Sequence, residues 1–220
     1  MKMLYVMLGD IKSSTQIPDR RSFQQVLRSA CRRLNRTAGR DIVASFKPLK
    51  GVDEVGGALA SPGSAYDLVV GFLDTIRPQQ ARFVLTYGEV DVGSTSADVA
   101  DMDGPAFNAA ADAMADLKES DLVFKTDLGV RSLDASVTGL ANALLLQRHR
   151  WTERQSAAVA AYREQGSQSA AAARLHITQQ AVSKALEGAS WRDLAVLEAY
   201  LREALRTLQL RAVHQGARQT

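Results

Sequence analysis

The stretch SQSAAAARLHITQQAVSKALE, residues 167–187, predicts two short helices joined by a tight turn. The first helix has small and apolar residues along one side: Ala171, Ala172 and Leu175. It is expected to end at His176. The second is expected to start at Thr178, because a threonine oxygen at that position can accept the free backbone N–H groups of a helix start. The small alanines allow the two helices to cross closely.

The second helix of this pair divides into an apolar and a polar face. The apolar face is predicted to hold Ile177, Ala181, Val182 and Leu186. The polar face holds Thr178, Gln179, Gln180, Ser183 and Lys184. Such side chains bond base edges and phosphates in a major groove, so this helix pair predicts a helix-turn-helix that binds double-stranded DNA. The alternative is an ordinary helical hairpin with a polar outer face.

Composition and charge restrict the class of protein. With 220 residues, 46% hydrophobic and 23% charged, the chain is expected to be a soluble globular protein of one large or two small domains. It has no long apolar run, and its single cysteine fits a reducing cytoplasm, so we expect a cytoplasmic protein without a membrane partner. Residues 1–147 carry 16 basic and 18 acidic side chains, a balance of −2, and residues 148–220 carry 11 and 6, a balance of +5. The excess of basic residues lies in the part with the predicted DNA-binding helices.

The first 130 residues alternate strand-like and helix-like segments. The expected order is strand, helix, strand, strand, helix, strand, helix, strand, from residues 3–8, 23–34, 42–49, 52–59, 66–76, 82–92, 107–117 and 122–125. Ser22 and Gln25 form a possible capping box for the first helix. This order predicts an α+β domain with a ferredoxin-like βαββαβ core whose helices cover one sheet face.

Residues 131–220 are predicted to form an all-α domain, consisting of a helical linker and the helix-turn-helix. Residues 133–162 have a continuous helical pattern, and a last helix is expected over Trp191–Leu210. Leucines recur in that last helix at 194, 197, 201, 205 and 208. This stripe could pack on the helix-turn-helix or form the seam of a dimer.

Carboxylates are predicted to meet at one end of the sheet. Asp10 ends the first strand, and Asp53-Glu54 lies at the hairpin between the second and third strands, which is adjacent to it in a βαββαβ sheet. Asp10 and Asp53 could together hold Mg²⁺, while the turn at Ser13, Ser14 and Thr15 could meet phosphate oxygens. The alternative is that Asp10 closes a turn and the hairpin tip is solvated.

The motifs GDIKSST at residues 9–15 and VDEVGGAL at residues 52–59 resemble the SatD family of small bacterial proteins, which in turn resembles the class III nucleotide cyclases. RFVLTYGEVDVG, residues 82–93, is similar to the cyclase strand with spaced glycines. DMDGPAFN, residues 101–108, matches the D-x-x-G-x-x-x-N spacing. The resemblance implies metal-binding roles for Asp10 and Asp53, a base contact by Asp101 and ribose orientation by Asn108. Lys125 could meet a terminal phosphate.

Three positions depart from the cyclase pattern. Asp112 stands one helical turn after Asn108, where the pattern has an arginine that stabilises charge on the α-phosphate. Val52 replaces the glycine expected before Asp53, and Leu49 replaces an expected base-selecting lysine. These departures predict a domain that binds a metal–nucleotide but cyclises it poorly.

Three functions agree with these observations. The first is a DNA-binding transcription regulator, a homodimer whose cyclase-like domain senses a nucleotide, with Mg²⁺ as its cofactor, without catalysis. The second is an active metal-dependent nucleotide cyclase or other phosphoryl-transfer enzyme that carries a helix-turn-helix. The third is a ligand-free dimerisation domain attached to a DNA-binding module. The first is favoured because Asp112 counts against the second, and folding alone does not require the Asp10–Asp53 pair.

Overall fold

The computed structural model describes residues 1–216, with side chains up to residue 208. The chain divides into two compact units, which are described separately. The first contains Met1–Leu140 and the part of the last helix, α8 (Trp191–Gly216), that follows Leu201, and the second contains Ala141–Leu201. Residues 217–220 of the predicted second domain lie outside the described residues.

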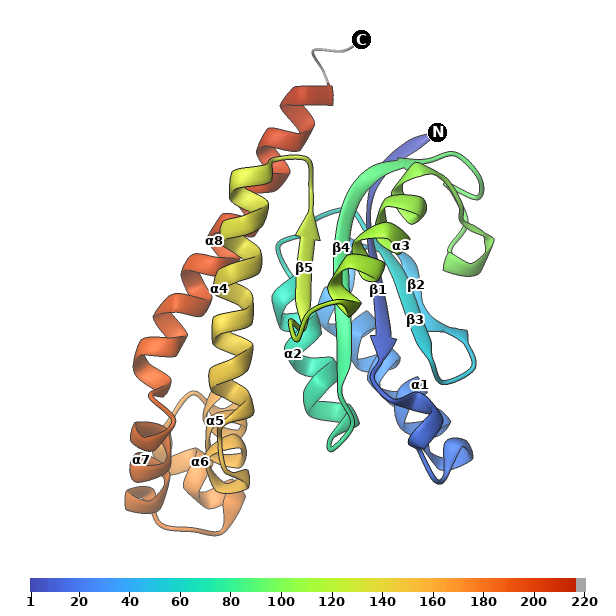
Figure 1. Cartoon of the computed structure of the whole chain (residues 1–220). Helices are drawn as coiled ribbons and strands as arrows, with labels where there is room; N and C mark the ends of the chain where they lie inside the picture. The colour runs from blue at the N-terminus through green and yellow to red at the C-terminus, as the bar shows by residue number, and fades with distance from the viewer. Residues whose placement is uncertain (217–220) are drawn as a thin grey trace. The chain divides into compact units, whose positions relative to one another are not determined.

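The first unit is a mixed α+β structure built on a five-stranded sheet (Figure 1). Its strands are β1 (Lys2–Ile11), β2 (Ile42–Lys50), β3 (Glu54–Leu59), β4 (Ala81–Val90) and β5 (Phe124–Asp127), in the spatial order β2-β3-β1-β4-β5. The central strand β1 pairs antiparallel with both β3 and β4, β2 pairs antiparallel with β3, and β5 pairs parallel with β4. The elements follow one another along the chain in the predicted order.

Helices cover both faces of this sheet (Figure 1). On one face, α3 (Pro105–Lys118) packs its alanines 106, 110 and 113 against Leu4, Val6 and Leu8 of β1. The helices α1 (Arg20–Ala38) and α2 (Ala65–Ile76) cover the opposite face of the sheet. There the ring of Phe72 meets the edge of Phe83, with 4.9 Å between ring centroids. Helices were predicted on one face only, which is wrong for α3.

Close approach of backbone to neighbouring groups explains two glycines of the motifs. A Cβ at Gly88 would lie 3.2 Å from Cα of Ala106, so the absence of a side chain brings α3 onto β4. A Cβ at Gly9 would collide with the Phe83 ring and lie 2.7 Å from Cγ2 of Val55. Both positions therefore serve packing inside the first unit.

Local details at two helix starts differ from the predictions. Asp19, not Ser22, caps α1, and its carboxylate accepts the Ser22 N–H at 2.9 Å, so the predicted capping box is wrong. The pattern over 133–162 is two helices, α4 (Arg131–His149) and α5 (Glu153–Gln165). Thr152 starts α5 with a capping box that includes Gln155, so a new helix begins within the segment predicted as continuously helical.

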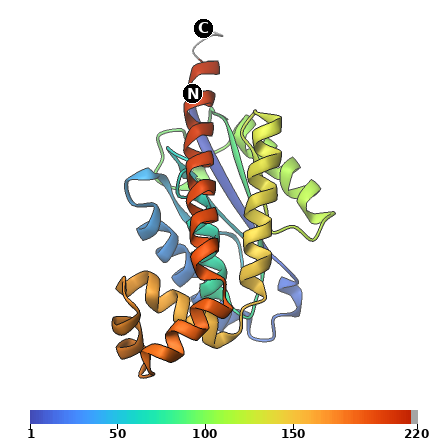
Figure 2. The ribbon, with the colours of Figure 1, turned by 90° about the vertical axis from the view of Figure 1, so that its left-hand side faces the viewer.

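The second unit is helical. It contains the end of α4, α5, α6 (Gln168–Leu175), α7 (Gln179–Gly188) and the start of α8 (Trp191–Gly216). Figure 2 shows the short helices, in orange, gathered beside the first turns of α8, and α5, α6 and α7 contact one another. The 3-10 helices η1 (Ser14–Gln16), η2 (Gly39–Asp41) and η3 (Val99–Asp101) belong to the first unit. No helix among residues 1–216 has the length and apolar character needed to cross a membrane.

Most of the predicted leucine stripe of α8 is used internally. Leu194, Leu201, Leu205 and Leu208 are buried, whereas Leu197 is 39% exposed.

The single cysteine, Cys31 on α1, is also buried. Burial raises the pKa of its thiol to about 12, so this cysteine is a packing residue.

Replacement of Gly9 by alanine is expected to lower the free energy of unfolding by about 1–3 kcal/mol, because the added methyl group overpacks a filled core. Chemical unfolding followed by circular dichroism measures it. Gly139→Ala is the matched control, since a Cβ at this α4 position meets open space, and it is expected to raise stability by up to about 1 kcal/mol. Equal effects of the two substitutions would contradict the packing role of Gly9.

Candidate functional site

The first predicted site, the Asp10–Asp53 pair, lies at one end of the sheet. Asp10 is in register with Glu54, and the N–H of Ile11 donates to the carbonyl oxygen of Asp53 at 2.8 Å. The end of β1 and the β2–β3 hairpin are thus adjacent, as expected. Gly51, with a φ of 59°, supplies the positive backbone angle of the turn, so the hairpin closes with Val52 before Asp53.

Each of these two aspartates meets a cation of the chain itself. Lys118 Nζ, at the end of α3, lies 2.7 Å from Asp10 Oδ1. Arg20 Nη2, at the start of α1, lies 3.2 Å from Asp53 Oδ1. A hydrogen bond from the Ser14 side chain, and then the Arg20 guanidinium, hold the pKa of Asp53 below its ordinary value.

The turn after β1 is fixed by the same arginine. Arg20 Nη1 donates to the Ser14 carbonyl oxygen at 2.9 Å, and Ser13 adopts a left-handed backbone with a φ of 52°. Ser14 and Thr15 lie in η1. The sequence analysis did not single out Arg20 or Lys118. Their positions in the sequence offered one signal: Arg20 is the first residue of the helix α1 and Lys118 is the last residue of the helix α3, and both helices pack on the sheet.

These residues do not present a ready set of Mg²⁺ ligands. Both carboxylates are bound by protein cations, and among the described side chains, residues 1–208, no group of three or more His, Cys, Asp or Glu is placed to hold a metal. Mg²⁺ usually takes one or two carboxylates together with water and phosphate oxygens. A metal here would have to replace Lys118 and Arg20.

The predicted base and ribose contacts lie at the other end of the sheet. Asp101 is in η3, where Ser96 Oγ donates to its carboxylate at 2.9 Å, and Asn108 is exposed near the start of α3. This start lies against Gly88, which is in register with Leu4, six residues along β1 from Asp10. At the rise of a strand, that separation is roughly 20 Å. One chain therefore does not bring Asp10 and Asn108 to one nucleotide.

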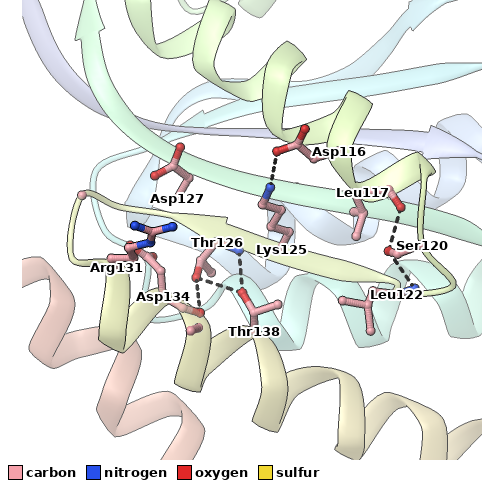
Figure 3. Close-up of a pocket in the computed structure, with 12 residues that line it drawn as sticks. Asp116, Leu117, Ser120, Leu122, Lys125, Thr126, Asp127, Arg131, Asp134 and Thr138 are labelled. Carbon is pink, nitrogen blue, oxygen red and sulfur yellow. Dashed lines mark hydrogen bonds and ion pairs between the residues drawn. The ribbon is translucent and has the colours of Figure 1, made fainter.

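Lys125 belongs to a third place, a cavity of about 790 Å³ between the end of α3, β5 and the start of α4 (Figure 3). Lys125 Nζ pairs with Asp116 at 2.8 Å. Arg131, Asp127 and Asp134 also line the cavity, and both Asp134 oxygens accept backbone N–H groups at 3.0 Å. None of the other predicted nucleotide-binding residues lines this cavity.

The second unit presents the predicted polar residues at its surface. α6 ends at His176 in a left-handed conformation, and Thr178 caps α7, its hydroxyl oxygen accepting the Ala181 N–H at 3.1 Å. Five predicted DNA contacts are exposed: Thr178, Gln179, Gln180, Ser183 and Lys184. Val182 and Leu186 are buried as predicted, but Ile177 and Ala181 are exposed, so their assignment to the buried face is wrong.

A buried ion-pair cluster holds the helices of this unit together. Glu198 on α8 is 2% exposed, and its carboxylate oxygens lie 3.6 Å from Arg148 Nη1 and 3.8 Å from Arg163 Nη1. The Arg148 guanidinium lies over the Trp151 ring and that of Arg163 over the Trp191 ring. The two rings meet edge to face.

The same cluster reaches the end of α7. Trp151 Nε1 donates to the carbonyl oxygen of Ala189, the residue that follows α7, at 3.1 Å. Buried charges are stable only when paired, so the cluster fixes how α4, α5 and α8 meet and where α7 ends. Sequence reasoning did not identify Glu198 as a buried residue, because it lies among exposed-looking charges on α8.

Comparison with protein families gives an identification. The model of the SatD family matches residues 4–209. This chain belongs to the SatD family. No match to a curated protein was found for this SatD-family chain.

Solved structures similar to the SatD-family chain include two of a bacterial light-regulated adenylyl cyclase. One is 17% identical with a TM-score of 0.42, covering 59% of this chain and 44% of that chain. The other is 20% identical with a TM-score of 0.40, covering 60% of this chain and 79% of that chain. The SatD-family chain thus spans less than half the length of the first of these proteins.

Substitution Glu198→Ala is expected to lower the free energy of unfolding by about 3 kcal/mol, because it removes the buried carboxylate that pairs with the largely buried Arg148. Thermal or chemical unfolding measures the change. Glu203→Ala is the matched control on α8: its ion pair with Arg206 is solvent-exposed and is expected to contribute at most about 1 kcal/mol. If Glu198→Ala is as stable as this control, the cluster does not hold the unit together.

Proposed function

We propose that this SatD-family chain is a DNA-binding transcription regulator whose helix-turn-helix, α6 and α7, enters the major groove of double-stranded DNA. The carrying observation is the N-terminal end of α7, where residues 177–181 are all exposed and the helix start is capped by Thr178. Val182 and Leu186 are buried and hold α7 in place, so the polar side chains on its other face are exposed to solvent.

Charge agrees with this proposal. On α7, Lys184 is an exposed cation on the same side as Gln180, four residues apart, where it can reach a phosphate. Arg174 of α6 is partly neutralised by Glu164 at 3.3 Å. Phosphate contacts from few cations imply moderate affinity and dependence on base contacts for specificity.

The first unit is proposed to be a ferredoxin-like, nucleotide-cyclase-like sensor that does not catalyse cyclisation. The strand order β2-β3-β1-β4 and the placement of α1 and α2 support the ferredoxin-like assignment. Asp112, one turn after Asn108, argues against catalysis because it places an anion near the α-phosphate position.

A homodimer is part of this proposal. The Asp10–Asp53 pair and Asn108 lie roughly 20 Å apart along the sheet of one chain. A second copy could bring the two ends together around one nucleotide, with Mg²⁺ where Lys118 and Arg20 now lie. Two copies of the DNA-binding unit would then read two half-sites of an operator. A cytoplasmic location fits such a regulator.

Gln180→Ala and Lys184→Ala are expected to weaken binding of a selected genomic DNA fragment in different ways. Loss of the Gln180 amide is expected to cost about 1–3 kcal/mol at one base pair and to relax specificity there. Loss of Lys184 is expected to weaken binding to all sequences and reduce the salt slope by about 1. Fluorescence anisotropy at several salt concentrations measures both. Arg28→Ala, an exposed α1 arginine, is the control; a response equal to that of Lys184→Ala would refute the assigned surface.

Nucleotide sensing is tested by thermal unfolding with a nucleotide panel, with and without Mg²⁺. A ligand at 100 times its Kd stabilises by about 2.7 kcal/mol, a rise in Tm of roughly 5–10 °C for a chain of this size. Asp10→Ala is expected to abolish the rise, whereas Asp74→Ala, on α2, is expected to keep it. Absence of any rise would favour the ligand-free dimerisation domain. Formation of a cyclic nucleotide from ATP or GTP with Mg²⁺ or Mn²⁺ would favour the active cyclase.

A further inference from the structure

Apolar groups accompany the polar ones at the N-terminal end of α7. Ile177, one residue before the Thr178 cap, is 45% exposed, and Ala181, on the first turn, is also exposed. Among the described residues of α5, α6, α7 and the turns between them, Ile177 is the one large aliphatic side chain at the surface. The sequence pattern had placed both residues in the core.

Helix capping explains only part of this position. A hydrophobic residue before an N-cap often packs on the fourth helical residue, which here is Val182. Val182 is fully buried, while nearly half of Ile177 remains in solvent. Ile177 precedes Gln179 and Gln180 by two and three residues, and all three side chains are exposed at the same helix start. A surface that binds this end of α7 is therefore expected to meet an aliphatic side chain as well as amides.

The side chains of this end match one kind of base pair. In the major groove the 5-methyl group of thymine is the apolar contact, and adenine N6 and N7 match a glutamine amide. Guanine is read by arginine or lysine and cytosine by aspartate or glutamate, and residues 177–181 contain neither kind of charge. The chemistry therefore favours A·T over G·C.

We infer that the N-terminal end of α7 reads A·T base pairs, with Ile177 and Ala181 against thymine 5-methyl groups and Gln179 or Gln180 on adenine. This inference rests on the proposed DNA binding. Ile177 is then a specificity-determining residue, and the operator half-site contains an A·T pair at the position facing the start of α7.

The experiment replaces thymine by deoxyuridine, one position at a time, in a duplex selected from genomic fragments by the full-length protein. This removes the 5-methyl group and leaves every hydrogen-bonding group of the base in place. Wild-type affinity is expected to fall about fourfold at one or two positions, the effect of one buried methyl group. At one of these positions, the Ile177→Ala variant is expected to bind the duplex with thymine and the duplex with deoxyuridine with equal affinity.

A control variant and the use of an affinity ratio separate base reading from folding. Leu146→Ala removes another exposed aliphatic side chain of the second unit, on α4, and is expected to keep the wild-type ratio between the two duplexes. The ratio for each variant is unaffected by a general loss of stability, because both duplexes meet the same protein.

The outcomes are distinguishable from those of the proposed function. Specific binding with no position sensitive to deoxyuridine overturns the inference and leaves DNA binding intact. An unchanged thymine preference in Ile177→Ala also overturns the role of this residue. Failure to bind any duplex at low salt overturns the proposed function and the inference with it.

Discussion

The second unit depends on one buried carboxylate. Glu198 is almost fully removed from solvent, and an ionised group in that position is stable only beside opposite charge. Arg148 and Arg163 provide that charge from α4 and α5, and each guanidinium also covers a tryptophan ring. Trp151 in turn donates a hydrogen bond to the carbonyl oxygen of Ala189, which follows α7. The position of α7 and of its polar surface therefore depends on this network of buried charges and rings.

The first unit is held together differently, by close approach of small residues. α3 meets β1 and β4 through alanines, and the glycines of β1 and β4 leave room for Phe83 and for the α3 backbone. In such packing each added methyl group must displace a neighbour. The same close contact fixes both ends of α3. Its first turn carries Asn108, and its last residue, Lys118, forms an ion pair with Asp10.

Much of this arrangement was predictable where a local pattern decides the structure. Short strand-like segments, such as the apolar run at residues 3–8, predicted the strands, and helical spacing with the Thr178 cap predicted α6 and α7. The break before Thr152 was missed because the segment was taken as one helix, whereas the capping box of Thr152 and Gln155 begins a second helix there. The exposure of Ile177 and the burial of Glu198 could not be read from spacing, since both depend on which helix lies opposite.

The prediction of the acidic site was also limited to what strand pairing decides. Adjacency of Asp10 and Asp53 follows from strand pairing, whereas their pairing with Lys118 and Arg20 depends on where α3 ends and α1 begins. Asp53 and Arg20 are each more than 40% exposed, and ion pairs of that kind contribute about 0–1 kcal/mol. A ligand of Asp53 could therefore displace Arg20 at small cost. The anion at Asp112 is different: no rearrangement of a side chain converts it into the arginine that the cyclase pattern has there, and this supports the proposal of a sensor without turnover.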